Sequence, residues 1–256
     1  MVFTDPPYGV AIGDKNKDLQ DAGFGGGITE NIIGDTLAPE ELYKILVAAF
    51  SNLRELSDES CSYYVTSPQG GELGLMMMMM MRDAGLPVRH MLIWVKNAAT
   101  FSLGRLDYDY RHEPIFYTWG KSHHWYGEYS NTVIEDSKPI DKMSKPIDKM
   151  SKPELKELLR AYMQPQEQSA IYCDKPVKSK LHPTMKPVKL VARFILNSSQ
   201  KGDTVADIFG GSGTTMISCE QLGRKCRMME LDPGYCDVIV ARWEKLTGRK
   251  AVLVDG

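Results

Sequence analysis

Short apolar runs alternate with longer segments of helical periodicity along the 256 residues of this chain. The apolar runs predict strands at residues 2–4, 62–66, 88–96, 114–119, 204–208 and 224–229. Helical patterns occupy residues 39–56, 73–84, 154–163 and 216–222, and a further helix begins near Pro187. Together these elements predict an α/β fold, in which helices pack on a sheet.

The two predicted helices in the first third of the chain differ in their apolar patterns. In the helix at 39–56 the apolar side chains share one face, which is typical of a helix that packs on a sheet: Leu42, Ile45, Leu46, Ala49 and Leu53. The helix at 73–84 contains six consecutive methionines, Met76 to Met81, and a run that is apolar all round predicts a buried helix. Because methionine fills irregular gaps in cores, we interpret this run as packing and not as a metal site.

The first predicted strand ends directly before the segment Asp5-Pro6-Pro7-Tyr8, whose chemistry suits an amino group. The Asp5 carboxylate and the Pro6 carbonyl can accept the two hydrogens of an exocyclic amine, and two such acceptors localise the nitrogen lone pair. Prolines restrict φ and carry no N–H, so this backbone is stiff and its carbonyls stay available. Tyr8 offers a flat face on which a base can stack. The alternative is an ordinary proline turn in which Asp5 acts as a cap.

A second candidate site follows the predicted strand at 204–208, where Asp207 precedes the glycine-rich segment 209–215. Strand, glycine turn and helix form the unit that binds dinucleotides or adenosyl cofactors, because glycines let the backbone approach a ligand closely. Glu230 ends the next predicted strand, about 20 residues further on, where an acidic residue suits ribose hydroxyls. A P-loop requires a lysine after its last glycine, and none follows Gly213, so the segment is not a P-loop. It also fits a nicotinamide fingerprint poorly, because Met216 stands where that fingerprint has its third glycine or alanine.

With both segments in view, the chain resembles the S-adenosylmethionine-dependent DNA methyltransferases that methylate amino groups, in their β-type motif order. Three blocks carry the resemblance: residues 4–9, residues 182–187 and residues 207–215. It covers most of the chain apart from residues 10–40 and 121–180, and further similar stretches are found at 92–96, 112–115, 230–236 and 242–244. The resemblance implies a Rossmann-like methyltransferase fold with permuted motif order, in which a mixed, mostly parallel sheet of the seven-strand type has helices on both of its faces. It also implies S-adenosylmethionine as the cofactor.

The resemblance also implies roles for individual residues. The catalytic pocket would consist of Asp5, Pro6, Pro7 and Tyr8. The cofactor would contact Phe209, Gly211 and Gly213 along its methionine and ribose parts, Glu230 at the ribose hydroxyls, and also His182, Thr184, Lys186, Asp207, Ser212 and Thr214. His182, Thr184 and Lys186 precede a predicted helix whose N-terminus would favour the cofactor's carboxylate. Without the resemblance, this segment would be interpreted as an ordinary helix start.

The family's motif order divides the chain into three parts. Residues 1–120 would form the catalytic half, 121–181 a target-recognition insertion, and 182–256 the cofactor-binding half. The insertion contains a seven-residue segment at 137–143 that repeats at 144–150 and begins again at 151, and proline in each copy excludes a heptad helix. From Lys121 to Arg193, 12 Lys and 2 Arg oppose 9 acidic residues, a local charge of +5 in a chain of net charge −2. Such a segment suits contacts with DNA phosphates, and equally a solvated surface loop.

Cysteine spacing and the start of the chain give expectations about metal binding, cellular location and the completeness of the sheet. The five cysteines, at 61, 173, 219, 226 and 236, show no metal-ligand spacing, so we expect reduced thiols and no metal. Without a signal peptide or an apolar run of 18 residues, we expect no membrane contact and a cytoplasmic location, in a bacterial or phage-infected cell. Met1 lies four residues before Asp5, whereas the family usually has another strand and helix upstream. We therefore expect either a compact layout or a truncated chain with part of its sheet uncovered.

The expected function is methylation of the N6 amino group of an adenine that is flipped out of double-stranded DNA. Adenine is preferred because the family usually begins the Asp5 motif with Asp or Asn for adenine and with Ser for N4-cytosine. An N4-cytosine methyltransferase is the first alternative, and a cofactor- or DNA-binding protein with impaired catalysis is the second. The DNA target sequence, a homodimer and a partner restriction endonuclease are left open.

Overall fold

A seven-stranded sheet forms the centre of the molecule in the computed structural model, which describes residues 1–23, 29–69, 71–96, 110–127, 170–173 and 185–254. Its strands are β1 (Val2–Thr4), β2 (Ser62–Thr66), β3 (His90–Val95), β4 (His112–Trp119), β5 (Ala170–Tyr172), β6 (Thr204–Asp207) and β7 (Lys225–Met228). The strand order is β5-β3-β4-β2-β1-β6-β7, and among these strands β4 alone runs antiparallel to its neighbours. The predicted mixed, mostly parallel sheet is confirmed.

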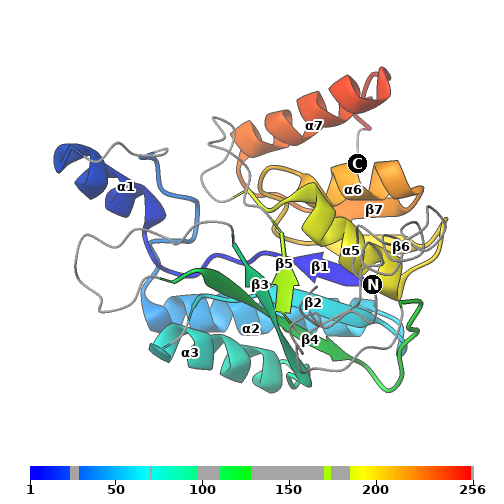
Figure 1. Ribbon diagram of the computed structural model, residues 1–256, viewed down its shortest axis with the longest axis horizontal. Coiled ribbons are helices and arrows are strands. Elements are labelled where there is room, and N and C mark those ends of the chain that lie inside the picture. Colours follow the sequence, from blue (N-terminus) through cyan, green and yellow to red (C-terminus); the bar gives the residue numbers. More distant parts are fainter. Residues whose placement is uncertain (24–28, 70, 97–109, 128–169, 174–184, 255–256) are drawn as a thin grey trace, which may run out of the picture.

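Helices cover both faces of this sheet, as predicted. They are α1 (Ile12–Asp21), α2 (Pro39–Leu56), α3 (Gly71–Asp83), α5 (Val188–Ser198), α6 (Thr214–Leu222) and α7 (Pro233–Thr247). In Figure 1, α2 and α3 lie below the sheet, whereas α5 and α6 lie above it. Among the helices of the described ranges, none combines the length and the apolar character that a membrane span requires.

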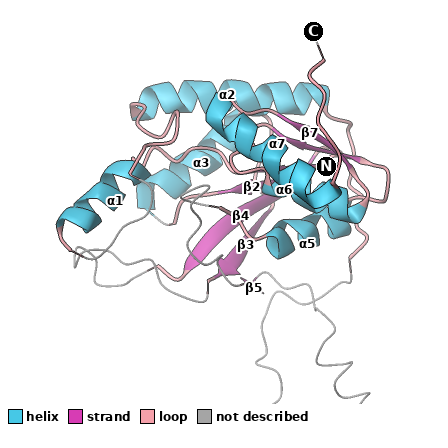
Figure 2. Ribbon diagram, turned by 90° about the horizontal axis from the view of Figure 1, so that it is seen from above, coloured by secondary structure: helices cyan, strands magenta, loops and turns pink. Residues whose placement is uncertain are grey.

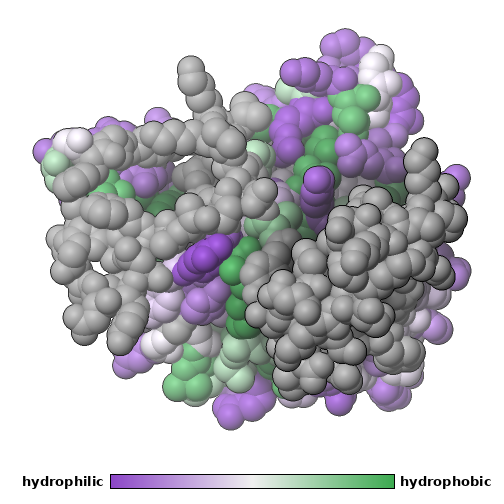
Figure 3. All heavy atoms as spheres, in the orientation of Figure 1, coloured by the Kyte–Doolittle hydropathy of each residue, from purple (hydrophilic) through white to green (hydrophobic). Residues whose placement is uncertain are grey.

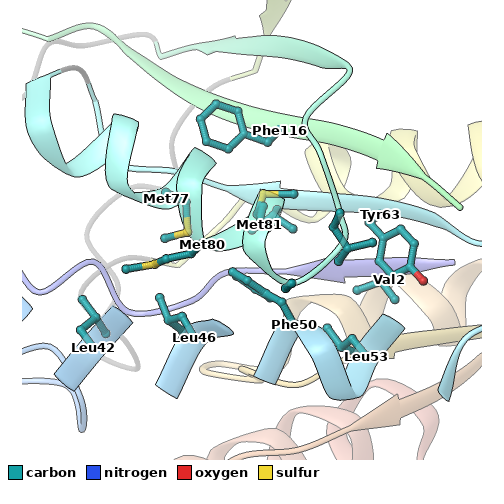
Figure 4. Close-up of a cluster of buried hydrophobic side chains, with 13 residues drawn as sticks. Val2, Leu42, Leu46, Phe50, Leu53, Tyr63, Met77, Met80, Met81 and Phe116 are labelled. Atoms are coloured by element: carbon teal, nitrogen blue, oxygen red, sulfur yellow. The ribbon is translucent and has the colours of Figure 1, made fainter. Parts of the chain in front are cut away.

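Alternation of side chains along the central strands supplies a core on each face. Successive residues of a strand point to opposite faces, so Val2 packs against α2 and α3 while Phe3 packs against α5. Figure 4 shows the first of these cores, in which Leu42, Leu46 and Phe50 of α2 meet Met77, Met80 and Met81 of α3. In the second core, Phe194 stacks on Phe3 and on Tyr64, with ring centroids 5.8 and 4.5 Å apart.

The methionine run is buried on one side only. Met77, Met80 and Met81 are at most 2% exposed, whereas Met79 is 39% exposed and Leu75 is 59% exposed. The prediction of a helix buried all round is therefore wrong. A helix that packs on one face of a sheet turns part of any continuous apolar run toward solvent.

Two elements of the structure were not predicted. Helix α1 has only Gly13 buried, and its mostly polar sequence offers just two large apolar residues, Ile12 and Leu19. It projects from the body of the molecule in both views (Figures 1 and 2). Strand β5 pairs with β3 at the edge of the sheet, although it lies inside the segment predicted as an insertion. The sheet thus takes one strand from that segment, and the division of the chain into three parts stays a prediction.

Helix α7 packs on the glycine-rich turn that follows β6. Asp232 caps the helix, since its carboxylate accepts the N–H of Gly234 at 2.7 Å and that of Tyr235 at 3.3 Å. A Cβ added at Gly213 would lie 3.0 Å from Ile239, so the turn and the helix are in direct contact. The outer surface of α7, at the top of Figure 3, shows both hydrophilic and hydrophobic residues.

Candidate active site

Polar side chains from six strands meet at one edge of the sheet. The carboxyl ends of parallel strands share an edge, and the antiparallel β4 begins where the others end. The residues at these ends are Asp5 after β1, Thr66 at the end of β2, Lys96 after β3, Glu113 near the start of β4, Asp207 at the end of β6 and Glu230 after β7. Strand β1, which lies between β2 and β6, thereby places Asp5 in the interior of the sheet edge.

A cavity of about 920 Å³ opens at this edge and joins the two predicted sites. Its walls include the whole segment from Asp5 to Tyr8 and, among the residues predicted to bind the cofactor, Lys186, Asp207, Phe209, Gly211, Ser212, Thr214 and Glu230. Of the predicted cofactor residues that the structure describes, Gly213 alone does not line it. Gly213 instead has a φ of 77° and packs on α7, so its role in the structure is to shape the turn.

Asp5 is held by Tyr8 of its own segment and by side chains from two other parts of the chain. Its Oδ1 accepts hydrogen bonds from the Thr66 hydroxyl and, at 3.1 Å, from the Tyr8 hydroxyl. Its Oδ2 accepts from the Lys186 ammonium at 2.7 Å. Because Thr66 ends β2 and Lys186 precedes α5, the carboxylate is oriented by both halves of the molecule.

Four charged residues of alternating sign form a row that begins at Asp5. Lys186 Nζ lies 2.7 Å from Asp5 Oδ2 and 2.9 Å from Glu113 Oε1, and Lys96 Nζ lies 2.9 Å from Glu113 Oε2. The side chains of Lys96, Glu113 and Lys186 are each only 7% exposed. Burial opposes the charge on Glu113, but Lys186 and Lys96 outweigh it and lower its pKa. Two cations and two carboxylates together leave the buried row with no net charge.

Tyr8 joins this row through its hydroxyl, which lies 3.1 Å from Asp5 Oδ1 and 3.3 Å from Glu113 Oε1. Burial, and then the charges of Glu113 and Asp5, raise the pKa of Tyr8 well above its ordinary value. The hydroxyl therefore stays protonated and donates to the carboxylates. Lys186 Nζ lies 5.9 Å from the centroid of the Tyr8 ring, within the range of a cation–π interaction.

Asp207 fixes the start of the glycine-rich turn. Its carboxylate accepts hydrogen bonds from Thr4 Oγ1 at 2.9 Å, from Thr215 Oγ1 at 2.6 Å and from the Phe209 N–H at 3.2 Å. These bonds connect β1, the turn and α6 through one buried group. Burial outweighs them and raises the pKa of Asp207 to about 7.

We expect this buried carboxyl to make the stability of the protein fall as the pH rises through the window between the two pKa values of Asp207. The pKa is about 7 in the folded protein and 3.8 in the unfolded chain, so the folded state binds more protons within that window. The free energy of unfolding should decrease there by up to about 1.4 kcal/mol per pH unit. Urea unfolding at several pH values from 5 to 7 should show this slope in the wild type and a flatter one in Asp207→Asn.

The matched control for this prediction is Asp203→Asn, at an exposed aspartate just before the same strand. Its pH slope should equal that of the wild type. An Asp207→Asn variant with the wild-type slope would contradict the prediction.

Glu230 anchors the turn from the other side. Its Oε2 accepts the Gly211 N–H at 2.7 Å, and its Oε1 accepts the N–H groups of Leu231 and Asp232, both at 2.9 Å. A carboxylate offers about four acceptor positions. Among the described contacts, Glu230 therefore keeps one position on Oε2, the oxygen that faces the turn.

Of the three predicted residues at the entry to α5, the structure describes Lys186 alone. His182 and Thr184 lie outside the described residues, as does all of the repeat at 137–153. Lys186 lies in the cavity wall, and its ammonium contacts Asp5 and Glu113. Its predicted cofactor contact stays a prediction. Within the described ranges no group of three or more His, Cys, Asp or Glu side chains is placed to hold a metal ion.

Sequence reasoning missed Thr66, Lys96 and Glu113 as site residues. A signal for the last two was present, because both lie in stretches that resemble the family, 92–96 and 112–115. The pairing of Trp94 with Glu113 brings these two stretches together. Helix α1 was also missed, although Ile12, Lys15 and Leu19 line the cavity. Its start is held by Asp35 and Asn31, whose side chains accept backbone N–H groups of α1 and of the residues just before it.

Comparisons with known proteins agree with this geometry. A family model described as a DNA methylase, of the N6/N4 methyltransferase type, matches residues 1–241. Type II methyltransferase M2.MboI of Moraxella bovis is 39% identical over 66 residues, which cover 26% of this chain and 24% of that protein. Type II methyltransferase M.HpaI of Haemophilus parainfluenzae is 41% identical over 71 residues, 28% and 22% of the two chains. The matched segments thus span about a quarter of each curated relative.

Solved structures share the fold over nearly the whole chain. The complex of M1.HpyAVI with S-adenosylmethionine superposes with a TM-score of 0.56 at 17% identity, over 94% of this chain and 87% of that one. The cytosine-N4-specific PvuII DNA methyltransferase gives 0.60 at 14% identity, over 94% and 78%. The predicted Rossmann-like methyltransferase fold is confirmed by these likenesses. Since the family model spans 241 of the 256 residues, the chain belongs to the N6/N4 DNA methylase family.

Proposed function

We propose that this protein transfers a methyl group from S-adenosylmethionine to an exocyclic amine of a base in double-stranded DNA, with adenine N6 as the first candidate. The observation that carries the proposal is the single cavity that joins Asp5-Pro6-Pro7-Tyr8 to the turn after β6. Its volume of about 920 Å³ lies at the upper end of the range for ligand pockets, which suits two ligands side by side.

The residues on the cofactor side fit an adenosyl ligand. Gly211 has a φ of 50°, and the absence of a side chain there lets the backbone come close to a ligand. Glu230 keeps an acceptor position toward the cavity for a ribose hydroxyl. Phe209, Ser212 and Thr214 would complete this wall. When bound, the cofactor supplies an activated methyl group on a sulfonium.

The residues on the catalytic side would bind and orient the amine. Asp5 and the Pro6 carbonyl would accept its two hydrogens. Among the described residues, no backbone N–H donates to the Pro6 carbonyl, which leaves it available to the amine. The Tyr8 ring would provide a stacking face for the flipped base. With the nitrogen lone pair localised and aimed at the methyl group, positioning would contribute most of the rate. The surplus proton of the amine would pass to water, since a carboxylate is a weak base toward it.

Adenine and N4-cytosine differ in how this site supports them. The aspartate at the head of the motif favours adenine, by the family tendency described above. The likeness to PvuII DNA methyltransferase, a cytosine-N4-specific enzyme, keeps N4-cytosine as the second candidate. Both bases present an exocyclic amine, so the same acceptors would serve either one. A homodimer and a partner endonuclease remain expectations, with no contact in the described residues assigned to them.

The test is methyl transfer from labelled S-adenosylmethionine to unmethylated genomic DNA, followed by mass spectrometry of the nucleosides. N6-methyladenine would support the proposal as stated, and N4-methylcytosine would keep the reaction but change the base. A protein that binds the cofactor without forming product would fit the impaired-catalysis alternative. A protein that forms no methylated product and does not bind the cofactor would overturn the proposal.

A further inference from the structure

The two oxygens of Asp5 are occupied unequally. Each oxygen of a carboxylate offers about two acceptor positions. Oδ1 receives two hydroxyl donors, Thr66 and Tyr8, whereas among the described residues Oδ2 receives the Lys186 ammonium alone. One acceptor position is therefore left, and it lies on the oxygen that Lys186 holds.

Lys186 is itself fixed at both ends. Its ammonium lies between Asp5 Oδ2 at 2.7 Å and Glu113 Oε1 at 2.9 Å, and Lys96 holds the other oxygen of Glu113 at 2.9 Å. Its backbone carbonyl accepts the Thr214 hydroxyl at 3.2 Å, at the first residue of α6. With a side chain only 7% exposed, Lys186 has little room to move.

We propose that Asp5 Oδ2 is the atom that accepts the hydrogen of the target amine, and that Lys186 is the positioning residue that sets this oxygen, held in turn by Glu113 and Lys96. The inference rests on the proposed function and deepens it by assigning the acceptor atom and its support. It also gives Lys186 a different role from the cofactor contact that the sequence predicts.

The chemistry of the group agrees with this role. An ammonium has three donors and no acceptor, so two can hold the carboxylates while none competes for the amine's hydrogens. Burial lowers the pKa of Lys186, but Asp5 and Glu113 more than offset this and raise it, so the charge persists over the working pH range. A displacement of about 1 Å in a group that orients the nucleophile costs roughly 100-fold in rate.

The experiment measures single-turnover methyl transfer to unmethylated genomic DNA at saturating S-adenosylmethionine, together with the Kd for the cofactor. We expect Lys186→Met to lower the transfer rate roughly 100-fold with little change in cofactor Kd. Thr66→Val, which removes a hydrogen bond to Asp5 Oδ1, should lower the transfer rate much less. Lys245→Met, at an exposed lysine of α7 outside the cavity wall, is the matched control and should keep the wild-type rate.

A pH profile separates positioning from a purely structural role. Lys186 is one of the charges that lower the pKa of Glu113, so in Lys186→Met the acid-side fall of the transfer rate should move to higher pH. In Lys245→Met the acid-side fall should stay in place. If Lys186→Met does not fold, Lys186→Arg replaces it, because a guanidinium keeps the charge but alters the geometry. That variant should melt near the wild-type temperature and still lose at least roughly 10-fold in rate.

Three outcomes would overturn the inference. The first is a wild-type rate and pH profile in Lys186→Met, or a wild-type rate in Lys186→Arg where the methionine variant does not fold. The second is a loss of cofactor affinity in Lys186→Met that parallels its loss of rate, which would assign Lys186 to cofactor binding. The third is a larger loss in Thr66→Val, which would point to Oδ1. If the wild type itself forms no methylated base, the proposed function fails, and this inference with it.

Discussion

Replacement of Asp5 by alanine is expected to lower methyl transfer to DNA by at least about 100-fold while leaving the Kd for S-adenosylmethionine nearly unchanged. The carboxylate lies on the catalytic side of the cavity, and the glycine turn that would hold the cofactor contacts it through no described hydrogen bond. Loss of a preorganised group that acts on the reacting centre affects the rate far more than the binding of a second ligand. Single-turnover transfer and calorimetric cofactor titration measure the two quantities.

The Asp5→Ala variant should also fold, because Lys186 keeps Glu113 as a partner at 2.9 Å. No buried cation is left unpaired, which is the usual cause of large losses in stability. The control is Asp237→Ala, at an exposed aspartate on α7, which should transfer methyl groups like the wild type. Substantial methyl transfer by a folded Asp5→Ala protein would remove Asp5 from its proposed role.

Replacement of Gly211 by valine is expected to weaken the Kd for S-adenosylmethionine by roughly 100-fold. Gly211 has a φ of 50°, a region that β-branched residues almost never adopt. Its N–H binds Glu230 at 2.7 Å, and its backbone lines the cavity. Strain of about 1–3 kcal/mol would therefore move the turn away from the geometry that binds the ligand, while the added side chain takes space in the cavity.

Gly248→Val is the matched control, since Gly248 has a φ of 70° at the end of α7 and lies outside the cavity wall. It carries a comparable backbone strain, so it should lose stability without losing cofactor affinity. Equal cofactor affinity in the wild type and in a folded Gly211→Val would count against the turn as the cofactor site. Equal losses in both variants would show that the effect is one of general stability.

Contiguous parts of the site were predictable, and parts assembled by tertiary structure were not. The segments at Asp5 and at the turn after Asp207 each combine a strand end with a local motif, so short sequence windows identify them. The contact of Lys186 with Asp5 joins residues 181 positions apart, and that of Tyr8 with Glu113 spans 105. A single sequence shows no signal for such distances until the strand order is known.

The fold followed the same division. Strands with continuous apolar runs were found, because burial on both faces makes them distinct. Strand β5 escaped, since three residues at a sheet edge carry little pattern. The methionine run of α3 shows the complementary limit: composition predicted burial, but only the packing partner decides which side of a helix is covered.

Because six strand ends converge on the pocket, its composition depends on the positions of the strands in the sheet and not on the order in which the chain connects them. Each end supplies its group through its place in the sheet, and β1 keeps Asp5 central whichever loop comes before it. A circular permutation that joined the same strands in another sequence would preserve the same neighbours in space. Different orders of the catalytic and cofactor segments along a gene are thus structurally equivalent solutions, and selection can rearrange them without redesigning the chemistry.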